Sequence, residues 1–140
     1  MGPRLVLLAT LLLAAACPRH PAPSSVSAPI GNAVQVEMQL LTVALETTVR
    51  GVGVGDVRGV EHALHQVHVA REATAAALAD GSYRPKRNAD RLAEFEALDT
   101  AFHVHLESLA TASRANDVPR TVEALSAALQ SCQGCHSQFR

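Results

Sequence analysis

Apolar residues recur every three or four positions along most of the chain beyond residue 31, which is the period of one buried face of an α-helix. Segments that contain glycine and proline interrupt this pattern and divide it into separate stretches. Four amphipathic helices are predicted, over residues 32–50, 56–79, 89–113 and 117–140. The longest connection is expected between the second and third helices, through Tyr83, Pro85 and Asn88.

Local signals predict where these helices begin and end. Three glycines, from Gly51 to Gly55, predict that the first helix stops in a flexible turn at Gly51. Asp56 is the expected N-cap of the second helix, because its short side chain can accept hydrogen bonds from free backbone N–H groups. Asn116 or Asp117 is the expected cap of the fourth helix.

The fourth helix has the most regular apolar stripe, with alternating steps of four and three residues. The residues expected to face inward are Val118, Val122, Leu125, Leu129, Cys132, His136 and Phe139. Chemically reactive side chains therefore continue a predicted core face rather than a solvent face. On the first and third helices, Met38 and Phe102 fall on the corresponding inward stripes.

The composition supports an all-α fold. Aromatic residues make up 3% of the chain and tryptophan is absent, which argues against a β-sandwich. No proline lies between Pro29 and Pro85, so long helices have room to form. Residues 32–140 are close to the common size of one domain and can bury a core, especially around a large apolar cofactor.

Residues 1–16 have the pattern of an export signal. The positive charge of Arg4 precedes an apolar run of roughly 12 residues, which is short for a permanent membrane anchor helix, the alternative interpretation. We therefore expect export to the periplasm and removal of this segment.

The next cysteine, Cys17, predicts a second processing event. Residues 13–17, Leu-Ala-Ala-Ala-Cys, resemble the lipobox of bacterial lipoproteins, in which the cysteine becomes the lipidated first residue. Residues 17–31 would then form a proline- and serine-rich tether between the membrane and the folded domain 32–140. Ordinary cleavage near Cys17 is the alternative.

Near the C-terminus the chain reads Cys132-Gln133-Gly134-Cys135-His136, the C-x-x-C-H attachment sequence of c-type haem. Two thiols must reach the two vinyl groups of one porphyrin while the adjacent imidazole binds the iron. Offsets of three and four residues place all three side chains on one helix face. We therefore predict one covalently attached haem c, with Cys132 and Cys135 as attachment residues and His136 as an axial iron ligand.

Two other uses of a C-x-x-C pair are alternatives. A structural zinc site needs four ligands, and the chain has no second C-x-x-C pair. A thioredoxin-like dithiol site lies near a βαβ pattern, which the sequence does not show.

Together the predicted helices and the motif resemble the four-helix cytochromes of the cytochrome c-prime family, including its six-coordinate members and a b-type periplasmic relative. The resemblance covers about residues 32–140 and is carried by the C-x-x-C-H segment, by Phe139-Arg140 after it, and by Met38 in the first helix. It implies an antiparallel four-helix bundle with haem bound near one end. His136 is then the proximal ligand.

The b-type relative also suggests roles for two further residues. Its iron is held by a methionine of the first helix and a histidine of the last, which implies Met38 as the sixth ligand. Residues 102–124 resemble its third helix, turn and fourth-helix entry, which places Phe102 in the haem pocket.

The expected function follows from the ligands. A His136/Met38 pair raises the reduction potential and closes the sixth position, so it favours an exported electron-transfer cytochrome. If Met38 only packs in the core, the iron is five-coordinate and the protein resembles a gas-binding member, with nitric oxide or carbon monoxide as ligand. The third alternative is a haem-free helical interaction module.

The sequence indicates less about binding partners and enzymatic activity. Electron transfer implies a redox partner protein, and the family resemblance adds a homodimer as an option. The formal net charge of −1 and the absence of a basic cluster argue against nucleic acid. No feature of the sequence requires enzymatic activity.

Five histidines of the second and third helices raise the question of another metal site. His65 and His68 fall opposite the apolar stripe, so we expect a solvated polar face there. His105 lies nearer the core stripe of the third helix and is the expected buried, hydrogen-bonded imidazole. The remaining two are His62 and His103.

Overall fold

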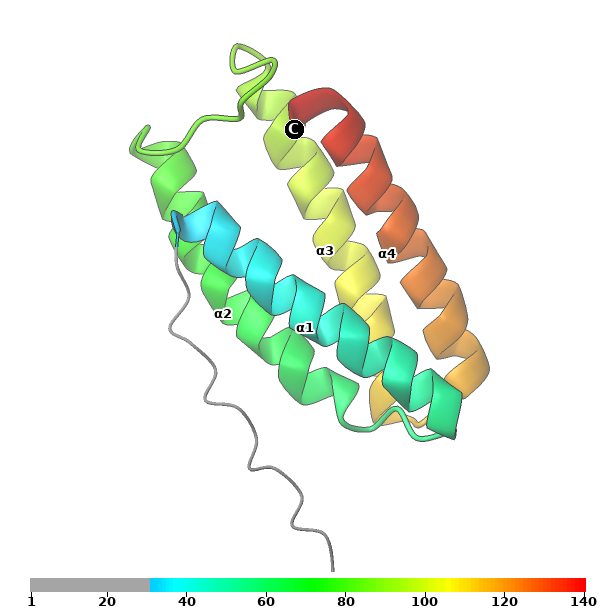
Figure 1. The fold of residues 1–140 in the computed structure, drawn as a ribbon. Coiled ribbons are helices and arrows are strands. Elements are labelled where there is room, and N and C mark those ends of the chain that lie inside the picture. Colours follow the sequence, from blue (N-terminus) through cyan, green and yellow to red (C-terminus); the bar gives the residue numbers. More distant parts are fainter. Residues whose placement is uncertain (1–30) are drawn as a thin grey trace, which may run out of the picture.

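The computed structural model describes residues 31–140, which form an antiparallel four-helix bundle (Figure 1). The helices are α1 (Ala33–Val54), α2 (Val60–Ala79), α3 (Leu92–Arg114) and α4 (Val118–Phe139). No strand occurs within residues 31–140, so the all-α prediction is confirmed. The predicted export signal, Cys17 and most of the tether lie outside the described residues. In the described part of the chain, none of the helices has the length and apolarity that crossing a membrane requires.

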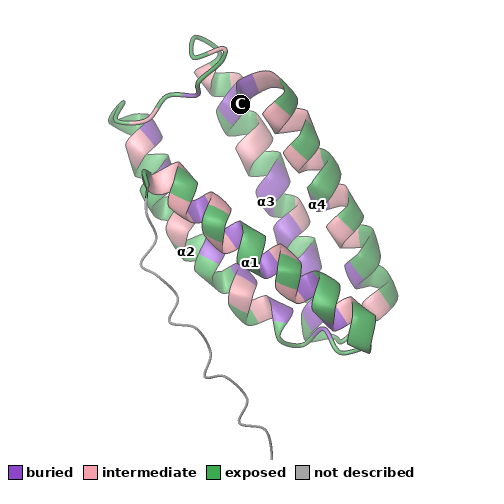
Figure 2. Cartoon of the chain, in the orientation of Figure 1, coloured by how far each residue is buried: buried purple, intermediate pink, exposed green. Residues whose placement is uncertain are grey.

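The bundle consists of two helical hairpins. α1 packs mainly against α2 and α3 mainly against α4, while the contacts between the two hairpins, α2 with α3 and α1 with α4, are fewer (Figure 1). Buried residues follow the faces that each helix turns toward the others (Figure 2). The two hairpins therefore leave room between them for a cavity.

Side-chain caps fix the beginnings of α1 and α4. Asn32 Oδ1 accepts a hydrogen bond from the Gln35 backbone N–H at 3.0 Å, and Gln35 Oε1 accepts one from the Asn32 N–H at 3.0 Å. This reciprocal capping box satisfies two N–H groups that the helix leaves free. At α4, Asp117 accepts from the Arg120 N–H, so the predicted cap at Asp117 is confirmed.

The prediction that the first helix stops at Gly51 was wrong. α1 continues for another turn and ends at Gly55, which has a left-handed conformation with φ of 74°. Gly51 is buried within the helix, and a Cβ there would lie 2.8 Å from the carbonyl oxygen of Asp56. Gly51 is therefore required by close backbone packing, whereas Gly55 supplies the turn.

Asp56 does not cap the second helix, contrary to prediction. α2 begins at Val60 after Gly59, while the Asp56 carboxylate accepts hydrogen bonds from the backbone and guanidinium of Arg58. The α1–α2 connection is held instead by the other hairpin. The Val57 N–H donates to Asn116 Oδ1 at 2.9 Å, and the Ser113 hydroxyl donates to the Val57 carbonyl.

α3 begins at Leu92, three residues later than predicted. Asn88 adopts a left-handed conformation with φ of 50°, and the Arg91 N–H donates to the Asn88 carbonyl. Residues 88–91 therefore form a separate turn before the helix.

The core has a main cluster along the bundle and a smaller cluster at one end. The buried members of the main cluster are Leu41, Ala44, Val57, Val60, Leu64, Val67, Phe102, Leu106, Leu109 and Ala128. The smaller cluster is formed by Leu78, Phe95 and Phe139. Members of both clusters line the candidate site.

The predicted α4 stripe was partly wrong. Val122 is 45% exposed, whereas Thr121 and Ala128 are buried. Leu129 is 48% exposed but lines the cavity between the hairpins, so it faces inward as predicted. Val118, Leu125 and Cys132 of the predicted stripe pack against the main core cluster, so most of this stripe faces inward. Phe139 is buried as predicted.

Candidate functional site

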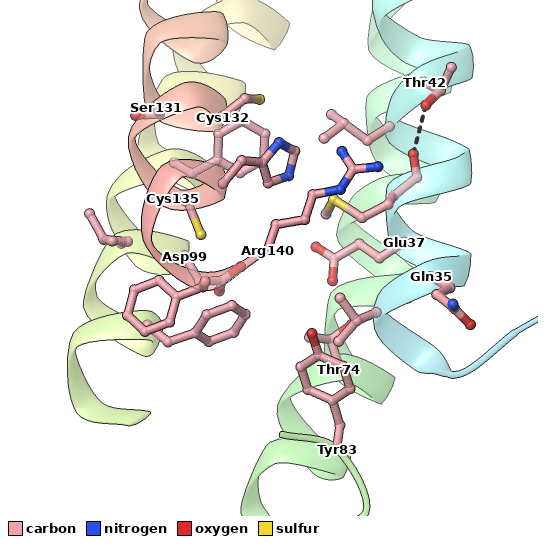
Figure 3. Close-up of a pocket in the computed structure, with 18 of the residues that line it drawn as sticks. Gln35, Glu37, Thr42, Thr74, Tyr83, Asp99, Ser131, Cys132, Cys135 and Arg140 are labelled. Carbon is pink, nitrogen blue, oxygen red and sulfur yellow. Dashed lines mark hydrogen bonds between the residues drawn. The ribbon is translucent and has the colours of Figure 1, made fainter. Parts of the chain in front are cut away.

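A cavity of about 500 Å³ lies between the two hairpins, toward the end where α1 begins and α4 ends (Figure 3). Its walls come from α1, α3 and α4, with Thr74 of α2 and Tyr83 and Lys86 of the α2–α3 loop. The volume is in the range of about 300–1,000 Å³ that is usual for small-molecule and cofactor sites. The predicted site residues that line it are Met38, Phe102, Cys132, Cys135 and His136.

The C-x-x-C-H segment lies within the last turns of α4. Cys132 and Cys135 are half-buried and carry free thiols. Cys132 packs against the main core cluster, and Cys135 packs against the smaller one. One helical turn therefore presents two thiols and the His136 imidazole to the same cavity.

The surroundings keep both thiols protonated. Burial raises the pKa of the Cys132 thiol. Burial also raises the pKa of the Cys135 thiol, and the negative charges of Asp99 and of ionised Cys132 add to the effect. A thioredoxin-like cysteine has a lowered pKa, because the thiolate is the attacking group. These surroundings do not favour the redox dithiol alternative.

The pKa of His136 is shifted in the opposite direction, downward. Burial, followed by the positive charge of Arg140, lowers the pKa of this imidazole. The Arg140 side chain reaches from the end of α4 toward α1 (Figure 3). A lowered pKa keeps the ring neutral near pH 7, which is the form that binds a metal ion.

Met38 and Phe102 line the same cavity from α1 and α3. Met38 is half-buried and packs against the main core cluster, and Phe102 is buried within that cluster. The cavity thus has a thioether on α1 and an imidazole on α4.

A buried polar group that the sequence pattern did not predict lies beside this cavity. Glu37 is 1% exposed, and its Oε1 lies 3.0 Å from Nε2 of His103, which is 2% exposed. Asp99 Oδ1 lies 3.6 Å from the same nitrogen. A periodic signal existed, because Glu37 occurs in register with Leu41, Ala44 and Thr48 on the buried face of α1.

The histidine predictions therefore need one correction. The buried imidazole of α3 is His103 and not His105, which is only half-buried. The buried face of α3 includes Phe102, His103 and Leu106, and this places His103 against α1 and α2. His65 and His68 are exposed, as predicted.

Neighbouring charges and hydrogen bonds set the protonation of His103 and Asp99. Burial alone would lower the pKa of His103, but the hydrogen bonds to Asp99 and Glu37 outweigh burial and raise it. Burial alone would raise the pKa of Asp99, but His103 and Arg71 outweigh burial and lower it.

Comparison with known proteins gives one match. The family model described as Cytochrome C' matches residues 36–140, which include nearly all of the four helices, Met38 and the C-x-x-C-H segment. No curated protein and no solved structure matches the chain.

Proposed function

Because the chain belongs to the cytochrome c′ family and is thus a c-type haem protein, we propose that it is an exported electron-transfer cytochrome. In this proposal Cys132 and Cys135 attach one haem, and His136 and Met38 bind its iron. The observation that carries the proposal is the single cavity that brings these four side chains together from α1 and α4.

The residues of the cavity fit such a group. Two free thiols one turn apart match two vinyl groups, and a neutral imidazole beside them is suited to iron. When bound, haem supplies an iron that alternates between ferric and ferrous states. The apolar side chains of Leu41 and Phe102 exclude water from the cavity wall.

Met38 determines which kind of cytochrome this is. A thioether bound at the sixth position would keep small molecules from the iron and would favour the ferrous state, because it is a soft ligand. His136 would bind the iron through its neutral nitrogen. Lys86 and Arg140, which also line the cavity, would pair with the two haem carboxylates.

A five-coordinate binder of nitric oxide or carbon monoxide is the second candidate. Met38 packs against the main core cluster, and a side chain that served only for packing would make this contact as well. A haem-free interaction module does not fit a chain that belongs to a family of haem proteins.

The deciding experiment is a visible spectrum of the full chain, produced with c-haem maturation machinery, reduced and then exposed to carbon monoxide. A low-spin spectrum that carbon monoxide does not change would support His136/Met38 ligation and electron transfer. A high-spin spectrum that shifts with the gas would replace this proposal with gas binding. Covalent attachment is tested by haem staining after denaturing electrophoresis, which Cys132→Ser with Cys135→Ser should abolish.

Cellular location forms a separate part of the proposal. We propose a periplasmic protein that is anchored by lipid on Cys17, which lies outside the described residues, and that exchanges electrons with a partner protein. Metabolic labelling with palmitate tests the anchor. The label should enter the wild-type chain, whereas Cys17→Ser should abolish both labelling and membrane association. A homodimer remains an option to be measured by sedimentation.

A further inference from the structure

Three side chains beside the haem cavity direct their ligand atoms toward one point. Glu37 comes from α1, while Asp99 and His103 lie one turn apart on α3. Their nearest carboxylate oxygens and the His103 nitrogen all lie within 4.8 Å of one another. Two of the three side chains are buried and the third is half-buried, so this is an internal cluster rather than a group of surface acids.

Hydrogen bonding alone leaves this cluster incompletely matched. Nε2 of His103 can carry one hydrogen, yet it faces Glu37 Oε1 at 3.0 Å and Asp99 Oδ1 at 3.6 Å. Arg71 Nε donates to the other Asp99 oxygen, Oδ2, at 3.1 Å. The Arg71 guanidinium thus pairs with Asp99, and the buried Glu37 carboxylate pairs with His103 Nε2, where a positive charge is needed, either a proton or a metal ion.

A second observation points to a missing oxygen-binding partner. Thr74 Oγ1 is the one buried side-chain polar atom in the described part of the chain that has no hydrogen-bond partner. Thr74 is 2% exposed, follows Arg71 by one turn on α2, and lines the same cavity as Glu37 and Asp99 (Figure 3). A buried hydroxyl without a partner calls for a bound water or ion.

We propose that Glu37, Asp99 and His103 bind one first-row divalent metal ion, separate from the haem iron. Bonds of about 2.0–2.2 Å in tetrahedral geometry separate ligand atoms by roughly 3.2–3.6 Å. The His103 nitrogen lies 3.0 and 3.6 Å from the two carboxylate oxygens, close to that spacing, and the two oxygens lie within 4.8 Å of each other. Imidazole with carboxylates suits zinc, iron or manganese, and three protein ligands leave a fourth position for water.

The surroundings supply an outer contact to the cluster. His103 also lines a shallow groove of about 140 Å³ on the outer side of α2 and α3, beside His65 and His68. Arg71 would orient Asp99 through Oδ2, as outer-shell partners of metal ligands do.

The test uses the full haem-loaded protein, in which the thiols are already consumed, after removal of divalent ions by a chelator. Zinc is titrated by calorimetry, and bound zinc is counted by elemental analysis. We expect one zinc per chain in the wild type. His103→Gln and Asp99→Asn should each weaken binding by at least about tenfold. The matched controls His62→Gln and His105→Gln should leave the affinity unchanged.

Two results would overturn the proposal. One is a wild-type protein that binds no stoichiometric zinc, which would make the cluster a hydrogen-bonded network only. The other is equal loss of zinc in the control variants, which would assign the ion to surface histidines. Because His103→Gln can also impair folding, the haem spectrum is compared first, and Asp99→Asn, which preserves shape, provides the independent measurement.

Discussion

Glu37 and His103 form a hydrogen bond of 3.0 Å across the diagonal of the bundle, from α1 to α3. These two helices are not neighbours, since the backbone contacts are α1 with α2, α3 with α4, α2 with α3 and α1 with α4. The next residue along α1 is Met38, which lines the cavity between the hairpins. The diagonal bond therefore fixes α1 beside the position from which Met38 faces the cavity.

The first prediction concerns the pH dependence of stability when divalent ions are removed. The folded-state pKa of His103 is raised, so its contribution is complete below the unfolded value of about 6.5 and is lost as pH rises through the folded value. The pKa of Asp99 is lowered, so its contribution is complete above about 3.9 and is lost as pH falls further. Stabilisation by the pair should thus be greatest between about pH 4 and 6.5.

His103→Gln measures this contribution. Guanidinium unfolding in the presence of a chelator should show the largest loss, about 1–3 kcal/mol, near pH 5, and a smaller loss near pH 8.5. Charged or titratable neighbours that face His103 are Glu37, Asp99, Arg71 and His68. His105→Gln is the control and should show no such trend. A loss that is the same at every pH would contradict the role of the His103 charge.

The second prediction compares two glycines of one helix. Gly51→Ala should destabilise the protein, because the new Cβ would lie 2.8 Å from the Asp56 carbonyl oxygen and 3.2 Å from the Val57 Cα, both backbone atoms. Gly53→Ala should stabilise it by about 0.5–1 kcal/mol, because nothing lies within 4 Å and alanine is the better helix former. Thermal unfolding of both variants measures the contrast. Equal effects on stability would mean that the α1–α2 connection, which contains Asp56 and Val57, moves away from residue 51 at little energetic cost.

The third prediction concerns the bond between the hairpins at the end opposite the cavity. Asn116 has φ of 53° and accepts from the Val57 N–H. Asn116→Ala should cost about 2–4 kcal/mol, since alanine disfavours this conformation and leaves the N–H without its partner. Asn116→Gly isolates the hydrogen bond and should cost less. Equal losses for the two variants would show that backbone strain contributes nothing.

Periodicity and the motif were sufficient for the fold and for much of the site. The four helices, the Asp117 cap and the shared cavity position of Met38, Phe102 and the C-x-x-C-H segment agree with the sequence analysis. Those predictions depend on local spacing, which a helix converts directly into shared faces. The roles of these residues toward haem remain predictions.

Features that depend on tertiary packing were missed. Gly51 looked like a turn residue because glycine at a turn and glycine at a close backbone approach look the same in a sequence. Glu37 is a charged residue whose burial depends on His103, 66 positions away. The exposure of Val122 depends on how α4 packs against its neighbours and not on the α4 pattern alone.

The last prediction separates electron transfer from gas binding at Met38. In the haem-loaded protein, Met38→Ala should convert a low-spin iron to one that binds carbon monoxide, because removal of the thioether opens the sixth position. The reduction potential should fall at the same time. The visible spectrum of the reduced protein, with and without the gas, together with a redox titration, measures both effects.

Leu45→Ala is the matched control for this change. Leu45 also lies on α1, is half-buried, lines the same cavity and packs against the main cluster, but it carries no ligand atom. Its truncation loosens the packing to a similar extent and should leave the spectrum low-spin. If Met38→Ala and Leu45→Ala both leave the wild-type spectrum unchanged, Met38 is a packing residue. If both open the iron to carbon monoxide, the closed sixth position depends on packing along α1 rather than on the thioether.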